Sequence, residues 1–451
     1  MVLPNGPAFA IRARLLTPLD AGGTRHEPDG LVVVDDSGSI VFAGPWSEAT
    51  PERRTSAVDL RPWVAMPGLV DLHAHLPQLP NAGLGAGLDL LTWLERYIFP
   101  LERAYDEATA ERLAPAAWRA FAAAGTTTAL VYGAVYEASL DATFRAAEAH
   151  GIRAIVGKVM MDRITYDPTI DPATILDRSL RESAALIERW HGADRDRLRY
   201  AVTPRFAVSC TAELLRESAA LAAATGAYWQ THVSEDRGEI EEVARLFPKA
   251  LDYVDVYDRA GGLGERTVLA HAVHLSDREL ARLVETGTRV AHCPASNLFL
   301  ASGVMPLGRY LDAGLGVGLG SDVAGGPDLS IFTAMRVGAY AKNALAVAGV
   351  AGAGPMARGA DRPMGPLDWL TLGSLGGARA LGLESRIGSV EVGKEAVAVR
   401  IGRLQSAFLL VERVSRPELV RQIIEFVGKR ERPLLVGNRH ISAGEFRFVR
   451  F

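Results

Sequence analysis

Two histidines stand one residue apart at the end of an apolar run, in the stretch MPGLVDLHAHLPQ at residues 66–78. Side chains alternate between the two faces of a β-strand, so His73 and His75 point the same way if this run is a strand. Neutral imidazole is the commonest metal ligand, and two on one face make a natural beginning of a metal site. The pair alone fits two polar residues at a strand end equally well, so the remaining sequence has to decide.

Later apolar runs also end in residues that can bind a metal or carry a proton. These are His232 and Glu235 in THVSE, His271 in LAHAVHL, and Asp322 in GLGSDVAGG. Three histidines and a carboxylate in one place would make an open metal site that keeps a coordination position for water. Taken singly, each also has a structural interpretation, since Glu235 suits a helix start and Asp322 a glycine-rich turn. Their occurrence at successive run ends favours the metal site.

Two more histidines lie near these candidates. His274 follows His271 by three residues and fits an ordinary residue at a strand end, and His292 occurs in VAHCPASN. We interpret His292 as a hydrogen-bonded polar residue beneath the site rather than as a ligand, because buried polar side chains are normally paired.

The elements that must position these residues read as strands alternating with helices. The eight candidate strands are GLVDLHAH, TTALVYGA, RAIVGKVMMD, RYAVTPRFAV, AYWQTHVSE, TVLAHAVHL, RVAHCPASN and GVGLGSDVAG. Between them lie amphipathic or alanine-rich stretches, among them SDRELARLVETG at residues 276–287, which begins with a capping-box pattern and ends in glycine. Near-continuous apolar strands in β/α units predict a closed (β/α)8 barrel of the TIM type. Residues at the carboxyl ends of its strands are then the functional candidates.

Both ends of the chain differ from this pattern. Residues 1–65 read as short strands and turns without a helix pattern. A helix predicted over residues 367–383 closes the barrel part, and residues 387–402 and 432–444 return to short strands. We therefore expect a barrel at residues 67–383 and a small β-sandwich domain built from residues 1–66 and 384–451.

Composition excludes several classes of protein. The 451 residues carry a net charge of −4 and contain 48% hydrophobic residues, which gives no support for a nucleic-acid surface. No run reaches the ~20 apolar residues of a membrane span, and the N-terminus has no signal-peptide core. The two cysteines cannot build a disulfide framework, so we expect a cytoplasmic protein.

Competing motifs are weak. There is no P-loop and no G-x-S-x-G elbow, and the glycine-rich GAGPMA at residues 352–357 follows a helix rather than a strand, which favours a loop. A two-metal site bridged by a modified lysine would want a lysine on the fourth strand. Lys158 lies instead on the third, and the fourth carries Arg205. One metal ion per chain is the better prediction.

Several segments together resemble the amidohydrolase superfamily, in its mononuclear-zinc aminohydrolase branch: PGLVDLHAH, THVSE, LAHAVHLS, AHCPASNL and GLGSDVAGG. More specifically, HAHLPQ, LLTWLERYIFPLE, GTTT, VGKVMMD, VTPRF and SNLFLASG resemble the guanine deaminase family. The resemblance covers nearly the whole chain, including the split β domain. GSD stands where the family commonly has GTD, and Ala396 stands where it often has an acidic residue.

The resemblance implies a role for each candidate. One zinc ion would be held by His73, His75, His232 and Asp322. Glu235 would shuttle protons, Asp322 would also orient the attacking water, and His271 would help polarise the bound water or substrate. The purine would be held by Gln78, Arg205 and Phe206. The expected partners are a small-molecule substrate and, as is common in the family, a second copy of the chain.

Guanine also suits these residues chemically. It presents two acceptors, O6 and N7, along one edge, and the fork of Arg205 matches two acceptors, whereas adenine would place a donor where O6 stands. Two alternatives stay open. One is a deaminase or hydrolase of another aminated ring such as a pterin, a triazine or an oxidised purine, and the other is a non-catalytic scaffold with the same fold.

Overall fold

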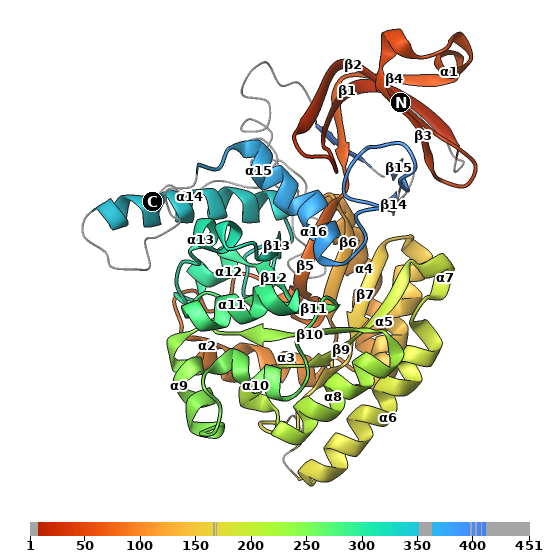
Figure 1. Ribbon diagram of the computed structural model, residues 1–451. Coiled ribbons are helices and arrows are strands. Elements are labelled where there is room, and N and C mark those ends of the chain that lie inside the picture. The colour runs from red at the N-terminus through yellow and green to blue at the C-terminus, as the bar shows by residue number, and fades with distance from the viewer. Residues whose placement is uncertain are drawn as a thin grey trace, which may run out of the picture.

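The computed structural model describes residues 8–165, 167, 169–350, 363–396, 399–401, 404–406 and 408–411. Its centre is a parallel sheet whose eight main strands follow the order β13-β12-β11-β10-β9-β7-β6-β5 (Figure 1). The strands are β5 (Leu69–His75), β6 (Thr126–Tyr132), β7 (Arg153–Gly157), β9 (Leu198–Pro204), β10 (Tyr228–Val233), β11 (Thr267–His271), β12 (Arg289–His292) and β13 (Gly316–Leu319). The short β8 (Val159–Met160) pairs with β9. All eight candidate strands are present, and the predicted (β/α)8 barrel is confirmed.

Hydrogen bonds just beyond β13 join the last strand to the first. The backbone N–H of Asp322 donates to the carbonyl of His73 at 2.7 Å, and that of His75 donates to the carbonyl of Val323 at 3.0 Å. This closure places the chain after β13 directly against the end of β5. The eight strands are almost entirely buried, as strands between an apolar interior and covering helices must be.

Helices surround the barrel (Figure 1). They are α2 (Leu90–Trp93), α3 (Phe99–Arg103), α4 (Glu107–Ala123), α5 (Glu137–His150), α6 (Pro172–Trp190), α7 (Ala193–Asp196), α8 (Ala212–Thr225), α9 (Arg237–Leu246), α10 (Tyr253–Arg259), α11 (Asp277–Thr286), α12 (Pro294–Phe299), α13 (Leu307–Asp312), α14 (Ile331–Val350), α15 (Pro366–Thr371) and α16 (Gly377–Ala380). No helix in the described part of the chain is long and apolar enough to cross a membrane.

The helix α11 shows how local sequence sets these bounds. The Ser276 hydroxyl accepts a hydrogen bond from the backbone of Glu279, and the Glu279 carboxylate accepts one from the backbone of Ser276, which completes the predicted capping box. Leu280 and Leu283 are buried, and Gly287 ends the helix with a φ of 70°.

The helix predicted over residues 367–383 is shorter and less regular than expected. It runs through α15, a π-helical turn over Leu372–Gly376 and α16, which ends at Ala380. A Cβ at Gly377 would lie 2.7 Å from the Cβ of Val70, so glycine permits the close approach of α16 to β5. The packing of this helix against the barrel therefore overrides a uniform helical repeat.

A second sheet brings together strands from both ends of the chain, in the order β16-β4-β1-β2-β3. Its strands are β1 (Phe9–Pro18), β2 (Thr24–Val34), β3 (Ile40–Pro45), β4 (Ala57–Pro67) and β16 (Phe408–Val411), while β14 (Val399–Ile401) pairs with β15 (Leu404–Ser406). β16 runs antiparallel to β4. One helical turn, α1 (Pro51–Thr55), interrupts the N-terminal strands where no helix was expected.

The expected domain boundaries at residues 66/67 and 383/384 stay a prediction, which the pairing of β16 with β4 supports. The strand expected at residues 432–444 and the loop at 352–357 lie outside the described residues.

Charged side chains fasten the segment after α16 to the barrel. Arg153 of β7 donates to Glu395 at 2.6 Å and to the backbone carbonyl of Asp196 at 2.7 Å. Arg386 also donates to Glu395 at 2.7 Å. The Arg153 side chain is only 3% exposed, and burial lowers its pKa. Because a guanidinium stays protonated in proteins, this buried charge needs the acceptors around it.

Glu395→Gln tests this attachment. Because buried Arg153 would lose its charged acceptor, we expect the free energy of unfolding to fall by about 1–3 kcal/mol in urea titrations. The control Asp177→Asn breaks a pair with Arg181 whose side chains are 68% and 69% exposed, and it should change stability by less than about 0.5 kcal/mol. Equal losses in the two variants would contradict a specific role for this contact.

Candidate active site

The predicted site residues meet at the carboxyl ends of the barrel strands. His73 and His75 lie at the end of β5, His232 in β10 and His271 at the end of β11, while Glu235 and Asp322 follow β10 and β13. With Gln78, Arg205 and Phe206, most of these side chains line one cavity, and Leu90, Trp93, Leu94, Glu239 and Leu300 complete its wall. Every residue assigned a site role from the sequence therefore lies in or directly beside this cavity.

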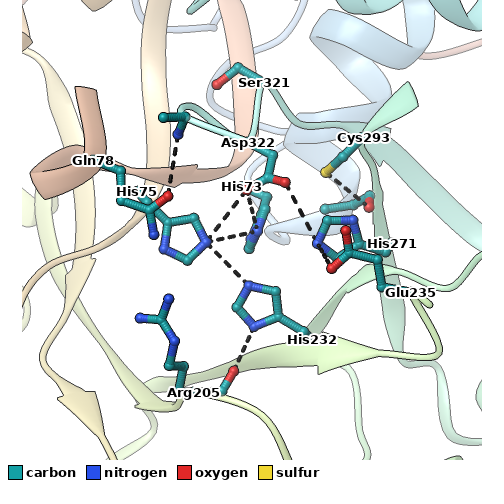
Figure 2. Close-up of polar contacts among 12 residues, drawn as sticks. His73, His75, Gln78, Arg205, His232, Glu235, His271, Cys293, Ser321 and Asp322 are labelled. Carbon is teal, nitrogen blue, oxygen red and sulfur yellow. Dashed lines mark hydrogen bonds and ion pairs between the residues drawn. The ribbon is translucent and has the colours of Figure 1, made fainter. Parts of the chain in front are cut away.

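Three imidazoles turn their Nε2 atoms toward one another (Figure 2). The Nε2 of His75 lies 3.3 Å from that of His73 and 3.2 Å from that of His232. Burial lowers the pKa of all three, so they are neutral near pH 7 and have lone pairs to offer. Nitrogens about 2.0–2.1 Å from a tetrahedral zinc ion are about 3.3 Å apart, so the observed spacing fits a shared metal ion.

Asp322 adds a carboxylate to the same cluster. Its Oδ1 lies 3.1 Å from the Nε2 of His73 and 3.5 Å from that of His75. Burial opposes ionisation of Asp322, but attraction to the His73 ring when that ring carries a proton holds the pKa of Asp322 below its usual value. Asp322 has a φ of 48°, a conformation that costs a non-glycine residue energy and that is often found at functional sites. Three neutral nitrogens and one anionic oxygen are a donor set that suits a divalent ion.

Hydrogen bonds behind the cluster fix the direction of its members. The Nδ1–H of His232 donates to the backbone carbonyl of Arg205 at 2.5 Å, which leaves the Nε2 lone pair facing the cluster. Asp71 accepts from the backbone N–H groups of His73 at 3.1 Å and Ser321 at 3.0 Å, and from the Ser321 hydroxyl at 2.5 Å. Burial raises the pKa of Asp71 to about 6. We did not expect this role from the sequence, although Asp71 stands two residues before His73.

Glu235 and His271 form the second half of the site. The Nε2 of His271 lies 3.3 Å from Glu235 and 3.7 Å from Asp322, while its Nδ1–H donates to Asn297 at 2.9 Å. Burial, reinforced by the negative charge of Asp322, raises the pKa of Glu235 well above its usual value. Glu235 can therefore hold a proton near neutral pH, as a general acid must.

The side chains expected to hold a purine lie on the other flank of the cluster. In Figure 2, Gln78 and Arg205 lie on the His75 side, whereas Glu235 and His271 lie on the opposite side. Gln78 and Arg205 both donate to Glu102, at 2.7 and 2.5 Å. The structure thus adds Glu102, which no sequence pattern singled out although it lies within the WLERYIFPLE segment.

The two other histidines considered from the sequence do not join the cluster of ligand atoms. His274 donates through Nε2 to the backbone carbonyl of Ser302 at 2.8 Å. His292 is buried beside His271, and burial lowers its pKa to about 3. Among the described residues, the groupings able to hold a metal comprise His73, His75, His232, His271 and Asp322.

The fold and this site define an amidohydrolase. The model of the Amidohydrolase family matches residues 64–416, and the chain belongs to that family. A probable guanine deaminase of Deinococcus radiodurans is 40% identical over 378 residues, which covers 82% of this chain and 82% of that protein.

Solved structures agree with this relationship. Guanine deaminase from C. acetobutylicum with bound guanine in the active site superposes with a TM-score of 0.82 at 26% identity, covering 93% of this chain and 96% of that one. An adenosine deaminase from Xanthomonas campestris with bound zinc superposes with a TM-score of 0.71 at 27% identity, covering 87% of this chain and 84% of that one. The family and the donor set of the site both point to a bound metal ion.

His232→Ala tests whether the cluster holds that ion. We expect protein expressed with ample metal to carry one divalent ion per chain, and the variant to retain less than half of it, because a tetrahedral donor set would lose one nitrogen. Elemental analysis of purified protein measures both values. His150→Ala, at the end of α5, is the matched control and should keep full occupancy. Two ions per wild-type chain, or full occupancy in His232→Ala, would contradict the assignment.

Proposed function

We propose that the protein catalyses the hydrolytic deamination of guanine to xanthine and ammonia with one zinc ion per chain. One observation carries the proposal. A single cavity brings a metal-ligand cluster and a protonatable carboxyl group, Glu235, together with the purine-binding candidates Gln78 and Arg205. The support from relatives is consistent, since guanine deaminases of several organisms are 34–40% identical to this chain.

We assign the metal ligands as His73, His75, His232 and Asp322. A divalent ion held by these residues would supply Lewis acidity, which would lower the pKa of a water molecule towards neutrality. Asp322 has two oxygens, of which Oδ1 faces His73 and His75 and Oδ2 faces His271. The second oxygen can accept a hydrogen bond from the attacking water and direct it at the amino-bearing carbon of the ring.

Glu235 moves the protons. It begins protonated and donates to the ring nitrogen beside the amino-bearing carbon, while the water oxygen forms its bond to that carbon. It then passes a proton to the amine, so that the carbon–nitrogen bond breaks with ammonia as the leaving group. The proton that Glu235 passes to the amine comes from the added oxygen, and the second proton of that oxygen returns to Glu235. One proton of water thus leaves with ammonia, and the other replaces the proton that Glu235 gave to the ring nitrogen. His271 lies beside Glu235 and Asp322, so its ring can reach the attacking water or the substrate and polarise it.

Purine recognition falls to the opposite flank. Arg205 is buried and lines the cavity, and one of its nitrogens, Nη1, donates to Glu102. A guanidinium carries five N–H donors, so the bond to Glu102 is compatible with donation to O6 and N7 of guanine. Phe206 lines the cavity and its ring can cover a flat substrate, and the amide of Gln78 can both donate and accept.

The same proposal includes a cytoplasmic homodimer that binds a small molecule. The homodimer and the small-molecule substrate are supported by the family resemblance. The cytoplasmic location is supported by Cys210 and Cys293, which are both buried and free, as is typical of a reducing compartment.

Glu235→Gln tests the proton shuttle. The amide keeps the shape of the side chain but cannot transfer a proton, so we expect kcat to fall by ~10² or more with metal content near that of wild type. Steady-state kinetics with guanine and elemental analysis measure the two quantities. Loss of the metal from the variant would make Glu235 a ligand and would overturn its assigned role.

Arg205→Lys tests the choice of guanine. Lysine keeps the charge but cannot donate two parallel hydrogen bonds to O6 and N7. A bidentate contact contributes ~1–3 kcal/mol, so kcat/KM for guanine should fall about 5- to 150-fold. Activity on a ring without the O6 acceptor should fall far less, and metal content should not change. Equal losses on all rings, or full activity on guanine, would show that this arginine, which directly follows β9, has a structural role only.

A further inference from the structure

Glu102 is a fully buried carboxylate beside the proposed active site. It lies in α3, at the end of a helical stretch formed by α2, the π-helical turn Leu94–Ile98 and α3. Side chains of the same stretch, Trp93 and Leu94, line the cavity. A buried charge is costly unless it is paired and hydrogen-bonded, so the partners of Glu102 show what it does.

The two carboxylate oxygens of Glu102 contact different members of the proposed purine pocket. Oε1 accepts from the Gln78 side chain at 2.7 Å, and Oε2 accepts from Nη1 of Arg205 at 2.5 Å. Oε1 also lies 3.9 Å from Nδ1 of His75. One side chain from α3 therefore touches a residue that follows β5 and a residue that follows β9, and it lies near a proposed metal ligand.

The Gln78 amide is held from both sides. Its Nε2 donates to Glu102, and its Oε1 accepts from the backbone N–H of Ala324 at 3.3 Å. If the amide turned over, its NH2 group would face the N–H of Ala324 and its oxygen would face the carboxylate. The position of donor and acceptor on Gln78 is thus determined by Glu102 and by the chain after Asp322.

Arg205 is held by the same helix in two ways. Its guanidinium carbon lies 5.3 Å from the ring centroid of Phe99 in α3, and its Nη1 donates to Glu102. Glu102 also supplies a negative charge beside a buried guanidinium, close to where a divalent ion would add further positive charge.

We propose that Glu102 is a positioning residue that sets the donor and acceptor pattern of the purine pocket through Gln78 and Arg205. The inference rests on the proposed function, because it assigns Gln78 and Arg205 to substrate binding. Glu102 does not line the cavity, so it acts through these side chains.

The substitution Glu102→Gln tests the proposal with almost no change of shape. Glutamine has one acceptor oxygen where glutamate has two. If that oxygen faces Arg205, its NH2 meets the NH2 of Gln78, and if it faces Gln78, its NH2 meets Arg205. One buried donor loses its acceptor in either case, and we expect KM for guanine to rise about 10- to 100-fold with a smaller change in kcat. A purely structural defect would instead reduce the active fraction, which lowers kcat and leaves KM unchanged.

Three comparisons complete the test. Glu95→Gln, on the exposed face of the same helical stretch, should keep wild-type KM and kcat. Glu102→Asp keeps the charge, but its side chain is one methylene shorter and its carboxylate lies farther from Gln78 and Arg205, so KM should also rise. If Glu102→Gln does not fold, Glu102→Asp is used for the test instead. In the Gln78→Ala background, Glu102→Gln should cost several-fold less in kcat/KM than in wild type, because one of its two partners is gone and the single amide oxygen can face Arg205.

The outcomes separate this inference from the proposed function. A metal-loaded wild-type protein that releases no ammonia from guanine would refute the proposed function. If wild type is active and the folded Glu102 variants keep its KM, or if the effects of Glu102→Gln and Gln78→Ala simply add, the positioning role is refuted and the proposed function stands.

Discussion

The arrangement of the whole site depends on four ligand atoms that share one small volume. The Nε2 atom of His75 lies 3.3 Å from that of His73 and 3.2 Å from that of His232, and a carboxylate oxygen of Asp322 lies 3.1 Å from the Nε2 of His73. Lone pairs that face one another repel, and a single proton can bridge only one pair of these atoms. A bound cation that all four atoms contact explains why they lie so close together. The barrel supplies the convergence because its closure places the chain after β13 against the end of β5. Burial then keeps the imidazoles neutral and available as ligands.

Hydrogen bonds behind this cluster hold its side chains in place, and different groups of polar side chains lie on its two sides. Asp71 ties His73 to the segment after β13, and the carbonyl of Arg205 directs His232. The carboxyl group of Glu235 faces the cluster on one flank and holds its proton because it is buried. On the other flank Glu102 connects α3 to Gln78 and Arg205, because each of its two carboxylate oxygens accepts a hydrogen bond from one of these side chains. Chemistry and recognition thus depend on groups from different elements that share one buried cluster.

Much of the fold could be predicted because barrel strands are buried on both faces and read as apolar runs. The same logic located His73, His75, His232 and Asp322, since side chains at strand ends must face the barrel mouth. Contacts made across long sequence separations could not be predicted in this way. Asp71 bonds to a residue 250 positions later, and Glu102 bonds to one 103 positions later. The π-helical turn before α16 also escaped prediction. Gly377 of α16 packs closely on Val70 of β5, a contact between distant residues that a local helical repeat does not reveal.

Guanine as the substrate is the central claim, and the most direct measurement is ammonia release by the metal-loaded wild-type protein. Guanine would be compared with a pterin, a triazine and an oxidised purine, and xanthine would be quantified in the same samples. The account predicts one ammonia per xanthine formed, the highest kcat/KM of the panel for guanine, and loss of activity on chelation that added zinc restores. Absence of ammonia from guanine, or a higher kcat/KM for another ring, would contradict it.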